Sequence, residues 1–229
     1  MRSVAGNCKI ISINGAPASG KDTQAEILAN RNPTAMVISP GQLLRDFSKG
    51  KSMYADLFDF DVQQLSLDLE NGALVDGEKL SDGVLGIMKR EFENGIDTFV
   101  LAGWPREERS YSRLMRFEPA PDERPTFQFV CLIVSDDEAR SRFERRVRGM
   151  KRLGENLRSD DTPEGFQARM DVFRNRTLPH LNIHADETGL IFINAEGSRK
   201  QTQAELRKEL HLDPVRPRVE GSLPLQARK

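Results

Sequence analysis

The stretch from Lys9 to Thr23 limits the possible folds more than any other part of the chain. It begins with a short apolar run, passes through a loop of small residues with one lysine, and leads into a segment with helical spacing. The loop consists of Gly15, Ala16, Pro17, Ala18, Ser19, Gly20, Lys21, Asp22 and Thr23. Small residues let successive backbone N–H groups point inward, and a helix start adds partial positive charge. The stretch predicts a phosphate-binding loop; the alternative is a glycine-rich turn that happens to contain a lysine.

The rest of the chain alternates short β-rich apolar runs with longer stretches of helical spacing. The expected strands are Lys9–Asn14, Ala35–Ser39, Thr98–Ala102, Phe127–Val134 and Leu190–Asn194. The expected helices are Lys21–Asn30, Gly41–Phe47, Met53–Asn71, Ser81–Glu93, Glu107–Phe117, Asp137–Gly149 and Glu164–His184. This alternation indicates a doubly wound α/β fold, in which ligands bind at the carboxyl ends of the parallel strands.

Composition excludes several classes of protein. The formal net charge is −1, so no basic field indicates nucleic acid. No apolar run approaches the roughly 20 residues that cross a bilayer, and no signal-peptide pattern is evident. Cys8 and Cys131 lie in apolar runs, and we expect two buried free thiols rather than a structural zinc site. We therefore expect a cytoplasmic protein that binds neither nucleic acid nor membranes.

Single arginines follow the second and third expected strands. Arg45 lies early in the helix after "ISPG", and Arg106 comes directly after Trp104 and Pro105. A lone arginine is more often a solvated surface residue. Two arginines at the carboxyl ends of neighbouring strands, beside a phosphate loop, could instead bind a second phosphate group through paired hydrogen bonds.

A second arginine-rich segment follows the fourth expected strand. Arg142 and Arg146 are four residues apart on one expected helix and so share a face. Arg158 and Arg169 lie on either side of an expected helix start. Such a charged segment is usually a solvated face, but an arginine-containing loop between two helices could also be a lid that closes over phosphates.

Together these pieces resemble the adenylate kinase family of nucleoside monophosphate kinases over roughly residues 9–210. The matching segments, in the family's order, are "NGAPASGKDTQAEILA", "ISPGQLLRDF", "NGALVDGEKL", "FVLAGWPREE", "RFERR", "RSDDTPEGFQARMDVFRNRTLP" and "INAEGS". The resemblance implies one domain over 1–212, with a five-stranded parallel sheet in a three-layer α/β/α P-loop fold. It also implies a helical monophosphate-binding segment at about 40–72 and a short, cysteine-free lid at about 147–159. The Pro-rich stretch 213–229 lacks periodicity, and we expect a flexible tail.

The resemblance implies a role for each matching residue. The residues expected to bind ATP are Gly15, Ala16, Pro17, Ala18, Ser19, Gly20, Lys21, Asp22, Thr23, Arg142, Arg146 and Gly197. The residues expected to bind the nucleoside monophosphate are Ser39, Pro40, Arg45, Leu74, Val75, Gly103, Arg106, Ser110, Arg158 and Arg169. The residues expected to act in catalysis are Lys21, Arg106, Arg146, Arg158 and Arg169. The acids expected to orient the lid arginines are Asp160 and Asp161.

The resemblance further implies ATP and a nucleoside monophosphate as substrates, with AMP favoured, and a monomeric enzyme. Mg²⁺ would accompany ATP, held mostly through water, and we expect no metal that is ligated directly by side chains. Transfer of this kind depends on positioning and positive charge rather than on a covalent step.

Three departures from the family's pattern leave alternatives open. Ala102 replaces an aspartate that usually helps to anchor the magnesium hydration shell, and Asp22 could supply a carboxylate in its place. Pro40 replaces a threonine, and Ser110 a glutamine, that normally lie by the acceptor base. The alternatives are a kinase for CMP, UMP or another monophosphate, and a nucleotide-binding protein with impaired catalysis.

Overall fold

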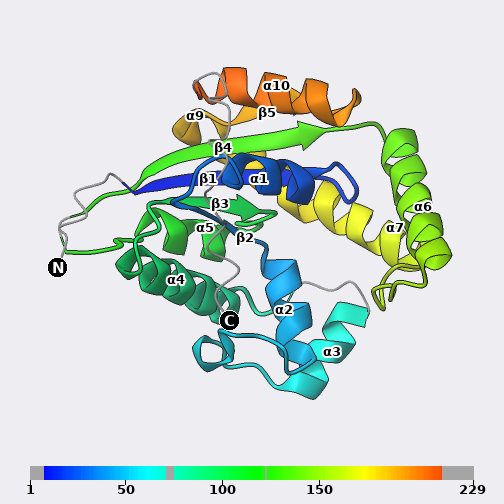
Figure 1. The fold of residues 1–229 in the computed structure, drawn as a ribbon, viewed down its shortest axis with the longest axis horizontal. Coiled ribbons are helices and arrows are strands. Elements are labelled where there is room, and N and C mark those ends of the chain that lie inside the picture. The colour runs from blue at the N-terminus through cyan, green and yellow to red at the C-terminus, as the bar shows by residue number, and fades with distance from the viewer. Residues whose placement is uncertain (1–7, 71–74, 122, 213–229) are drawn as a thin grey trace.

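Five parallel strands form a single sheet through the centre of the molecule (Figure 1). The computed structural model describes residues 8–70, 75–121 and 123–212. The strands are β1 (Lys9–Gly15), β2 (Ala35–Ile38), β3 (Thr98–Ala102), β4 (Thr126–Ile133) and β5 (Ile191–Asn194), in the spatial order β2-β3-β1-β4-β5. The expected parallel sheet is confirmed, and every strand end lies within one residue of its predicted position.

Alternation along the strands separates two hydrophobic cores. Ile10 and Phe99 point into one core, whereas their neighbours Ile11 and Val100 point into the other. All four side chains are at most 2% exposed, because both faces of the sheet are covered by helices. This pattern is expected for strands that are buried on both sides.

Helices form the two outer layers of the fold. They are α1 (Lys21–Ala29), α2 (Pro40–Ser48), α3 (Val62–Glu70), α4 (Gly77–Glu93), α5 (Glu108–Met115), α6 (Asp136–Leu153), α7 (Pro163–Val172), α8 (Leu178–Ile183), α9 (Ala185–Thr188) and α10 (Arg199–Glu209). Helices α1 and α10 pack on one face of the sheet, and α4 and α5 pack on the other. Helix α6 stands beyond the carboxyl ends of the strands (Figure 1). Within the described ranges, no helix is both long and apolar enough to span a bilayer.

The expected helix Met53–Asn71 is wrong as a single element. The chain forms a short 3₁₀ turn at Ala55–Leu57 and an extended residue at Phe58, and α3 begins only at Val62. Phe58 is 8% exposed, and a Cβ added at Gly83 of α4 would lie 2.1 Å from its ring. Packing of the Phe58 ring against the glycine face of α4 thus outweighs the local helical preference.

The expected helix Glu164–His184 is interrupted rather than continuous. Between α7 and α8 lies a π-helical turn at Phe173–Thr177. Pro179 follows, and a proline has no N–H to donate to the carbonyl four residues earlier, so a wider turn fits before it. Helix α7 begins as the sequence indicates, with the Thr162 side chain accepting a hydrogen bond from the Gly165 backbone.

Helices α9 and α10 were not predicted from the sequence. Helix α10 carries a readable signal, because the Ser198 hydroxyl accepts from the Gln201 backbone while the Gln201 side chain accepts from the Ser198 backbone. Such a capping box marks a helix start. Cys8 and Cys131 are buried free thiols, as predicted. The tail 213–229 lies outside the described residues.

Candidate active site

A cavity of about 980 Å³ runs along the carboxyl ends of β1 and β3. Its loop end is formed by the residues around Gly15–Thr23, and its helical end by residues of α2, α4 and α5 and their flanks. The predicted site residues that line it are Gly15, Pro17, Ala18, Ser19, Gly20, Lys21, Asp22, Thr23, Ser39, Pro40, Arg45, Val75, Gly103, Arg106, Ser110, Arg142, Arg146, Arg158, Arg169 and Gly197. The structure therefore gathers residues from most of the chain length into one space.

The loop end has the form of a phosphate cradle. Gly15 has φ 151°, and a Cβ there would lie 2.8 Å from the Leu132 carbonyl oxygen, so only glycine fits. The Lys21 ammonium donates to the carbonyl of Ala16 at 3.3 Å and thereby spans the loop. The Ser19 hydroxyl is buried without a hydrogen-bond partner among the described residues. The loop thus presents a lysine and an unused hydroxyl at the start of α1.

Lys21 sits in an environment that disfavours its charge. Burial is the main cause that lowers the pKa of Lys21 to about 8. Asp22 opposes this shift, and nearby Arg106, Arg158 and Arg169 add to it. Cations that repel one another in a shared space lose that penalty when an anion enters between them. The loop end is therefore arranged for a polyanionic ligand.

Arg106 is held against the loop end by the turn after β3. Its Nε donates to the Gly103 carbonyl at 2.6 Å. Gly103 has φ 73°, and a Cβ there would lie 3.0 Å from both an Arg106 guanidinium nitrogen and the Lys21 Cε. Burial lowers the pKa of Arg106. Gly103 is thus the residue whose small size lets the lysine and the arginine approach each other.

Two buried acids hold three arginines over the cavity. Arg169 donates to the Asp160 carboxylate at 2.7 Å, and Arg146 donates to the Asp161 carboxylate at 2.5 Å. The other Asp161 oxygen accepts from the Arg158 backbone at 3.3 Å, and the Asp161 side chain is fully buried. Asp160 and Asp161 therefore hold the guanidinium groups of Arg169 and Arg146, whereas they hold Arg158 only through its backbone.

Arg142 joins the loop end to the segment after β5. Its guanidinium donates to the carbonyls of Ser19 at 3.2 Å, Ala195 at 2.6 Å and Gly197 at 3.3 Å, and to the Glu138 carboxylate at 2.6 Å. Glu138 lies one turn earlier on α6 and fixes the arginine on that face. A planar cation held in this way at the cavity wall is suited to stack on a base.

At the helical end, Arg45 and Ser110 are engaged by local partners. Arg45 donates to the Gln42 side chain at 3.0 Å, and its pKa is lowered to about 10, first by burial and then by Arg158. The Ser110 hydroxyl donates to the Glu107 carbonyl of its own helix at 3.1 Å. Ser110 lines the cavity, but its only hydroxyl proton is used in this bond, so the hydroxyl can offer a ligand only an acceptor.

Asp22 is the anionic group among these cations. Its carboxylate accepts from the Ser39 hydroxyl at 3.0 Å, which links the loop end to the start of α2. Burial raises the pKa of Asp22, but Lys21, the Ser39 hydrogen bond, Arg158 and Arg106 together outweigh burial and lower it. The carboxylate therefore stays ionised and belongs to the cavity rather than to a solvated helix start.

Among the described residues, Ala16 is the predicted site residue that does not line the cavity. Leu74 lies outside the described residues, and Ala16 packs among Phe143 and Phe166 while its carbonyl faces Lys21. The Phe143 and Phe166 rings stack with centroids 4.6 Å apart, and both line the cavity, although they were not predicted. Their positions within the arginine-rich motifs were a signal that could have found them.

No family model matches this chain. Several known proteins, however, are similar to it over most of its length. Adenylate kinase isoenzyme 1 of Caenorhabditis elegans is 32% identical over 190 residues, which cover 82% of this chain and 81% of that protein. An adenylate kinase of Nautilia profundicola is 30% identical over 203 residues, covering 87% and 95%. One of a Sulfurovum species is 28% identical over 202 residues, covering 87% and 96%. The chain belongs to the adenylate kinase family.

Proposed function

We propose that this chain transfers the terminal phosphoryl group of ATP reversibly to a nucleoside monophosphate, with AMP as the preferred acceptor. The observation that carries the proposal is the convergence of Lys21, Arg106 and Arg169 with a phosphate loop in one cavity. Arg106 and Arg169 both lower the pKa of Lys21, and Arg169 also lowers the pKa of Arg106, as expected for cations placed close together. Membership of the adenylate kinase family supports the same reaction.

The two ends of the cavity would divide the substrates between them. The backbone of Gly15–Thr23 and Lys21 would bind the triphosphate, with Arg142 beside the donor base. Arg45 and Arg106 would bind the phosphate of the acceptor. The two phosphates would then meet between Lys21 and the arginines that Asp160 and Asp161 orient. Positive charge placed in advance around the transferring group lowers the barrier without any covalent step.

We propose that residues 147–159 act as the lid and residues 40–72 as the acceptor segment. Helix α6 extends to Leu153, so the lid consists of the last helical turns and a loop that begins at Gly154. Arg158 lies on that loop, and closing it would bring the arginine over the phosphates and exclude water, which would otherwise compete as acceptor.

The residues present at the loop end fit a magnesium ion. Mg²⁺ prefers oxygen ligands and keeps several waters, and this end offers the ionised Asp22 carboxylate, the Ser39 hydroxyl and the unpartnered Ser19 hydroxyl. We propose that Asp22 holds the hydration shell of the ion. The bound ion would neutralise charge on the phosphate oxygens.

The names of the relatives favour AMP over other acceptors, and the lining of the helical end is compatible with a base. The relatives reported above are all named adenylate kinase. The helical end is lined by Leu69, Val75 and Leu80, which suit a stacked base, with Glu107 and Ser110 as polar neighbours. The alternatives raised by Pro40 and Ser110 are not favoured, and the full set of cavity arginines argues against a protein that only binds nucleotides.

The experiment that tests the proposal measures phosphoryl transfer from ATP to AMP, CMP, UMP, GMP and dTMP in parallel. We expect the largest kcat/KM with AMP and formation of two ADP per turnover. A larger kcat/KM with CMP or UMP would show that AMP is not the preferred acceptor. If none of the five accepts a phosphoryl group, the proposed kinase activity is wrong.

We also propose that the enzyme works as a monomer in the cytoplasm. Both the loop end and the helical end of the cavity come from one chain, so a second copy is not needed to complete the site. The two thiols are buried and unpaired, which suits a reducing compartment. Light scattering after size-exclusion chromatography checks the oligomeric state, and cell fractionation checks the compartment.

A further inference from the structure

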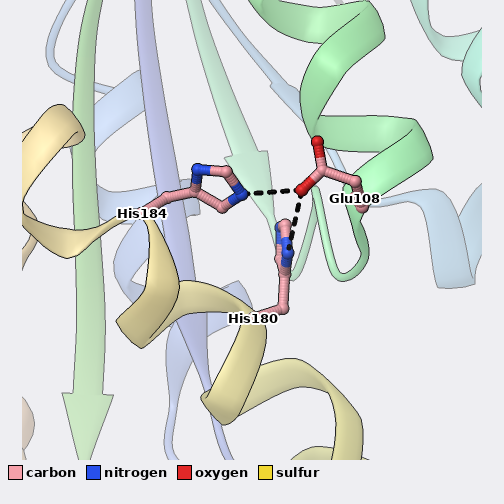
Figure 2. Close-up of side chains that lie close together, drawn as sticks. All are labelled: Glu108, His180 and His184. Carbon is pink, nitrogen blue, oxygen red and sulfur yellow. Dashed lines mark hydrogen bonds and ion pairs between the residues drawn. The ribbon is translucent and has the colours of Figure 1, made fainter.

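Two helices bring a carboxylate and two imidazoles together outside the catalytic cavity. Figure 2 shows His180 and His184 of the α8 region pointing toward one oxygen of Glu108 at the start of α5. Glu108 Oε2 lies 2.7 Å from His184 Nε2 and 3.9 Å from His180 Nδ1. One ligand atom from each residue lies within 4.8 Å of the others, and none of the three lines the cavity. In the described part of the chain, no second group of this kind occurs.

His180 is a buried imidazole that lacks the partners a buried imidazole needs. Its side chain is 9% exposed, and Nε2 has no hydrogen-bond partner among the described residues. The other nitrogen, Nδ1, faces Glu108 at a distance too long for a hydrogen bond. Nδ1 is therefore the nitrogen that can take a ligand placed between the three side chains, whereas Nε2 lies on another edge of the ring.

His184 is held in the orientation that metal-binding histidines adopt. Its Nδ1 lies 3.2 Å from a Glu187 carboxylate oxygen, on the side of the ring opposite Glu108. Its ring stacks on Tyr111, with the centroids 4.0 Å apart. A carboxylate on the far nitrogen fixes the ring and leaves the near nitrogen for the metal, which is the usual arrangement around ligating histidines.

We propose that Glu108, His180 and His184 form a binding site for a divalent transition-metal ion of the zinc class, separate from the magnesium of the reaction. Imidazole and carboxylate ligands suit Zn²⁺, Co²⁺ or Ni²⁺, whereas Mg²⁺ prefers oxygen ligands alone. The two histidines are four residues apart, so they project from one side of the same helical segment.

The observed spacing can close around such an ion. In a tetrahedral zinc site, metal–ligand distances of about 2.1 Å place the ligand atoms roughly 3.4 Å apart. The Glu108 side chain is 63% exposed, its Oε1 accepts from the Ser112 hydroxyl at 2.7 Å, and Tyr111 holds the His184 ring. A small rotation of the carboxylate about this anchor would bring Oε2 to similar distances from both imidazoles. Water would take the fourth position on the open side of Glu108.

A bound ion would join two distant segments of the chain next to the catalytic residues. Glu108 follows Arg106 by two residues, and His180 lies after the π-helical turn that ends α7, the helix of Arg169. The ion would therefore fix the start of α5 against α8. We expect it to stabilise the fold without taking part in phosphoryl transfer.

The test is a calorimetric titration of metal-free protein with Zn²⁺ in the absence of nucleotide. Thermal unfolding is then measured with and without the ion. We expect one ion per chain and a rise in melting temperature of roughly 5–10 °C when free zinc exceeds the dissociation constant about 100-fold. Bound Co²⁺ should give the visible absorption of a tetrahedral site with nitrogen and oxygen ligands.

Variants show whether the ion binds at this cluster. Glu108→Ala and His184→Gln should each weaken zinc binding more than about 100-fold, and Glu187→Gln should weaken it roughly 10- to 100-fold through the lost support of His184. His211→Gln is the matched control, since His211 is the third histidine of the chain and is exposed. It should bind zinc as the parent protein does.

Three results would overturn the proposal. They are no 1:1 binding by the parent protein, unchanged zinc affinity in both Glu108→Ala and His184→Gln, and loss of binding in His211→Gln. The buried His180 is left unchanged in the main series, and circular dichroism of each metal-free variant verifies the fold. His180→Gln, where it folds, should lose binding as well.

Discussion

The loop end and the helical end of the cavity differ in how they are built. The loop end comes from nine consecutive residues, Gly15–Thr23, and its shape depends on the backbone and on one lysine. The helical end is assembled from Arg45 of α2, Val75 before α4, Arg106 after β3 and Ser110 of α5. One end is therefore local in sequence, and the other depends on the packing of four separate segments.

This difference indicates what each end can tolerate. A backbone cradle binds phosphates through N–H groups, which every residue of the loop except Pro17 has, so its demands are small residues at fixed positions and a single cation. The helical end selects its ligand through side chains, so a change there alters preference or affinity. We expect substitutions at the loop end to abolish the reaction and substitutions at the helical end to weaken or redirect it.

Lys21→Met should have the largest effect. It removes the charge at the terminal phosphates while leaving an unbranched side chain of similar length, and we expect kcat to fall roughly 10²- to 10³-fold. The fold should remain, as judged by circular dichroism. Lys49→Met is the control, because Lys49 is exposed at the end of α2. If Lys21→Met keeps more than about a tenth of kcat, the loop is not the catalytic cradle.

Arg106→Lys tests whether the helical end depends on shape or only on charge. A guanidinium can make two parallel hydrogen bonds to a phosphate, whereas an ammonium acts as a point charge. Arg106 is also oriented by its bond to Gly103. We expect Lys to lower kcat/KM for the acceptor nearly as much as Ala does, by roughly 10²-fold. Full activity with Lys would show that Arg106 supplies only diffuse positive potential.

Gly103→Ala probes the contact between the two ends. The added Cβ would lie 3.0 Å from both Lys21 and Arg106, at a backbone φ of 73° that L-residues rarely adopt. Strain of this kind should lower the free energy of unfolding by about 1–2 kcal/mol. Displacement of the two cations should lower kcat/KM about 10-fold.

Gly189→Ala provides a matched control for that substitution. Gly189 has a similar φ of 60°, but no heavy atom lies within 4 Å of the added Cβ. It should lose comparable stability in thermal unfolding while keeping its kcat/KM. Equal activity of the two variants would mean that the close approach at Gly103 does not matter for transfer.

The same contrast explains how much the sequence could predict. The strands and the loop end were predicted nearly residue by residue, because alternation and a contiguous motif are local signals. The break at Phe58 was missed, since it depends on the glycine face that α4 presents. Ser110 was predicted to face the acceptor, but the sequence could not show that its hydroxyl bonds to Glu107.

The cluster of Glu108, His180 and His184 was missed for a related reason. The spacing of His180 and His184 is visible as "HLNIH" and could have been recognised as a pair on one helical face. Their carboxylate partner, Glu108, lies far away in sequence and is one of many acidic residues. Only the packing of α5 against α8 selects it.

Asp22 belongs to the loop end but contacts the helical end, and we expect its replacement to have the smallest effect. Its carboxylate accepts from Ser39 and lies beside Lys21. Without a cation between them, such a carboxylate would repel the phosphates by up to about 1 kcal/mol. If Asp22 holds the magnesium shell in place of the aspartate missing at Ala102, Asp22→Asn should raise the Mg²⁺ concentration that gives half-maximal rate, about fivefold.

A rescue experiment separates this role from a role in charge balance. Ala102 lines the cavity at the end of β3, so an aspartate there would reach the same space. Asp22→Gly should lower kcat a few-fold and weaken the response to Mg²⁺, and adding Ala102→Asp should recover much of both. If Asp22 only offsets the surrounding arginines, its loss would instead strengthen ATP binding and leave the magnesium titration unchanged. An unchanged titration in both Asp22 variants would therefore remove Asp22 from the magnesium shell and leave it as a link between the two ends.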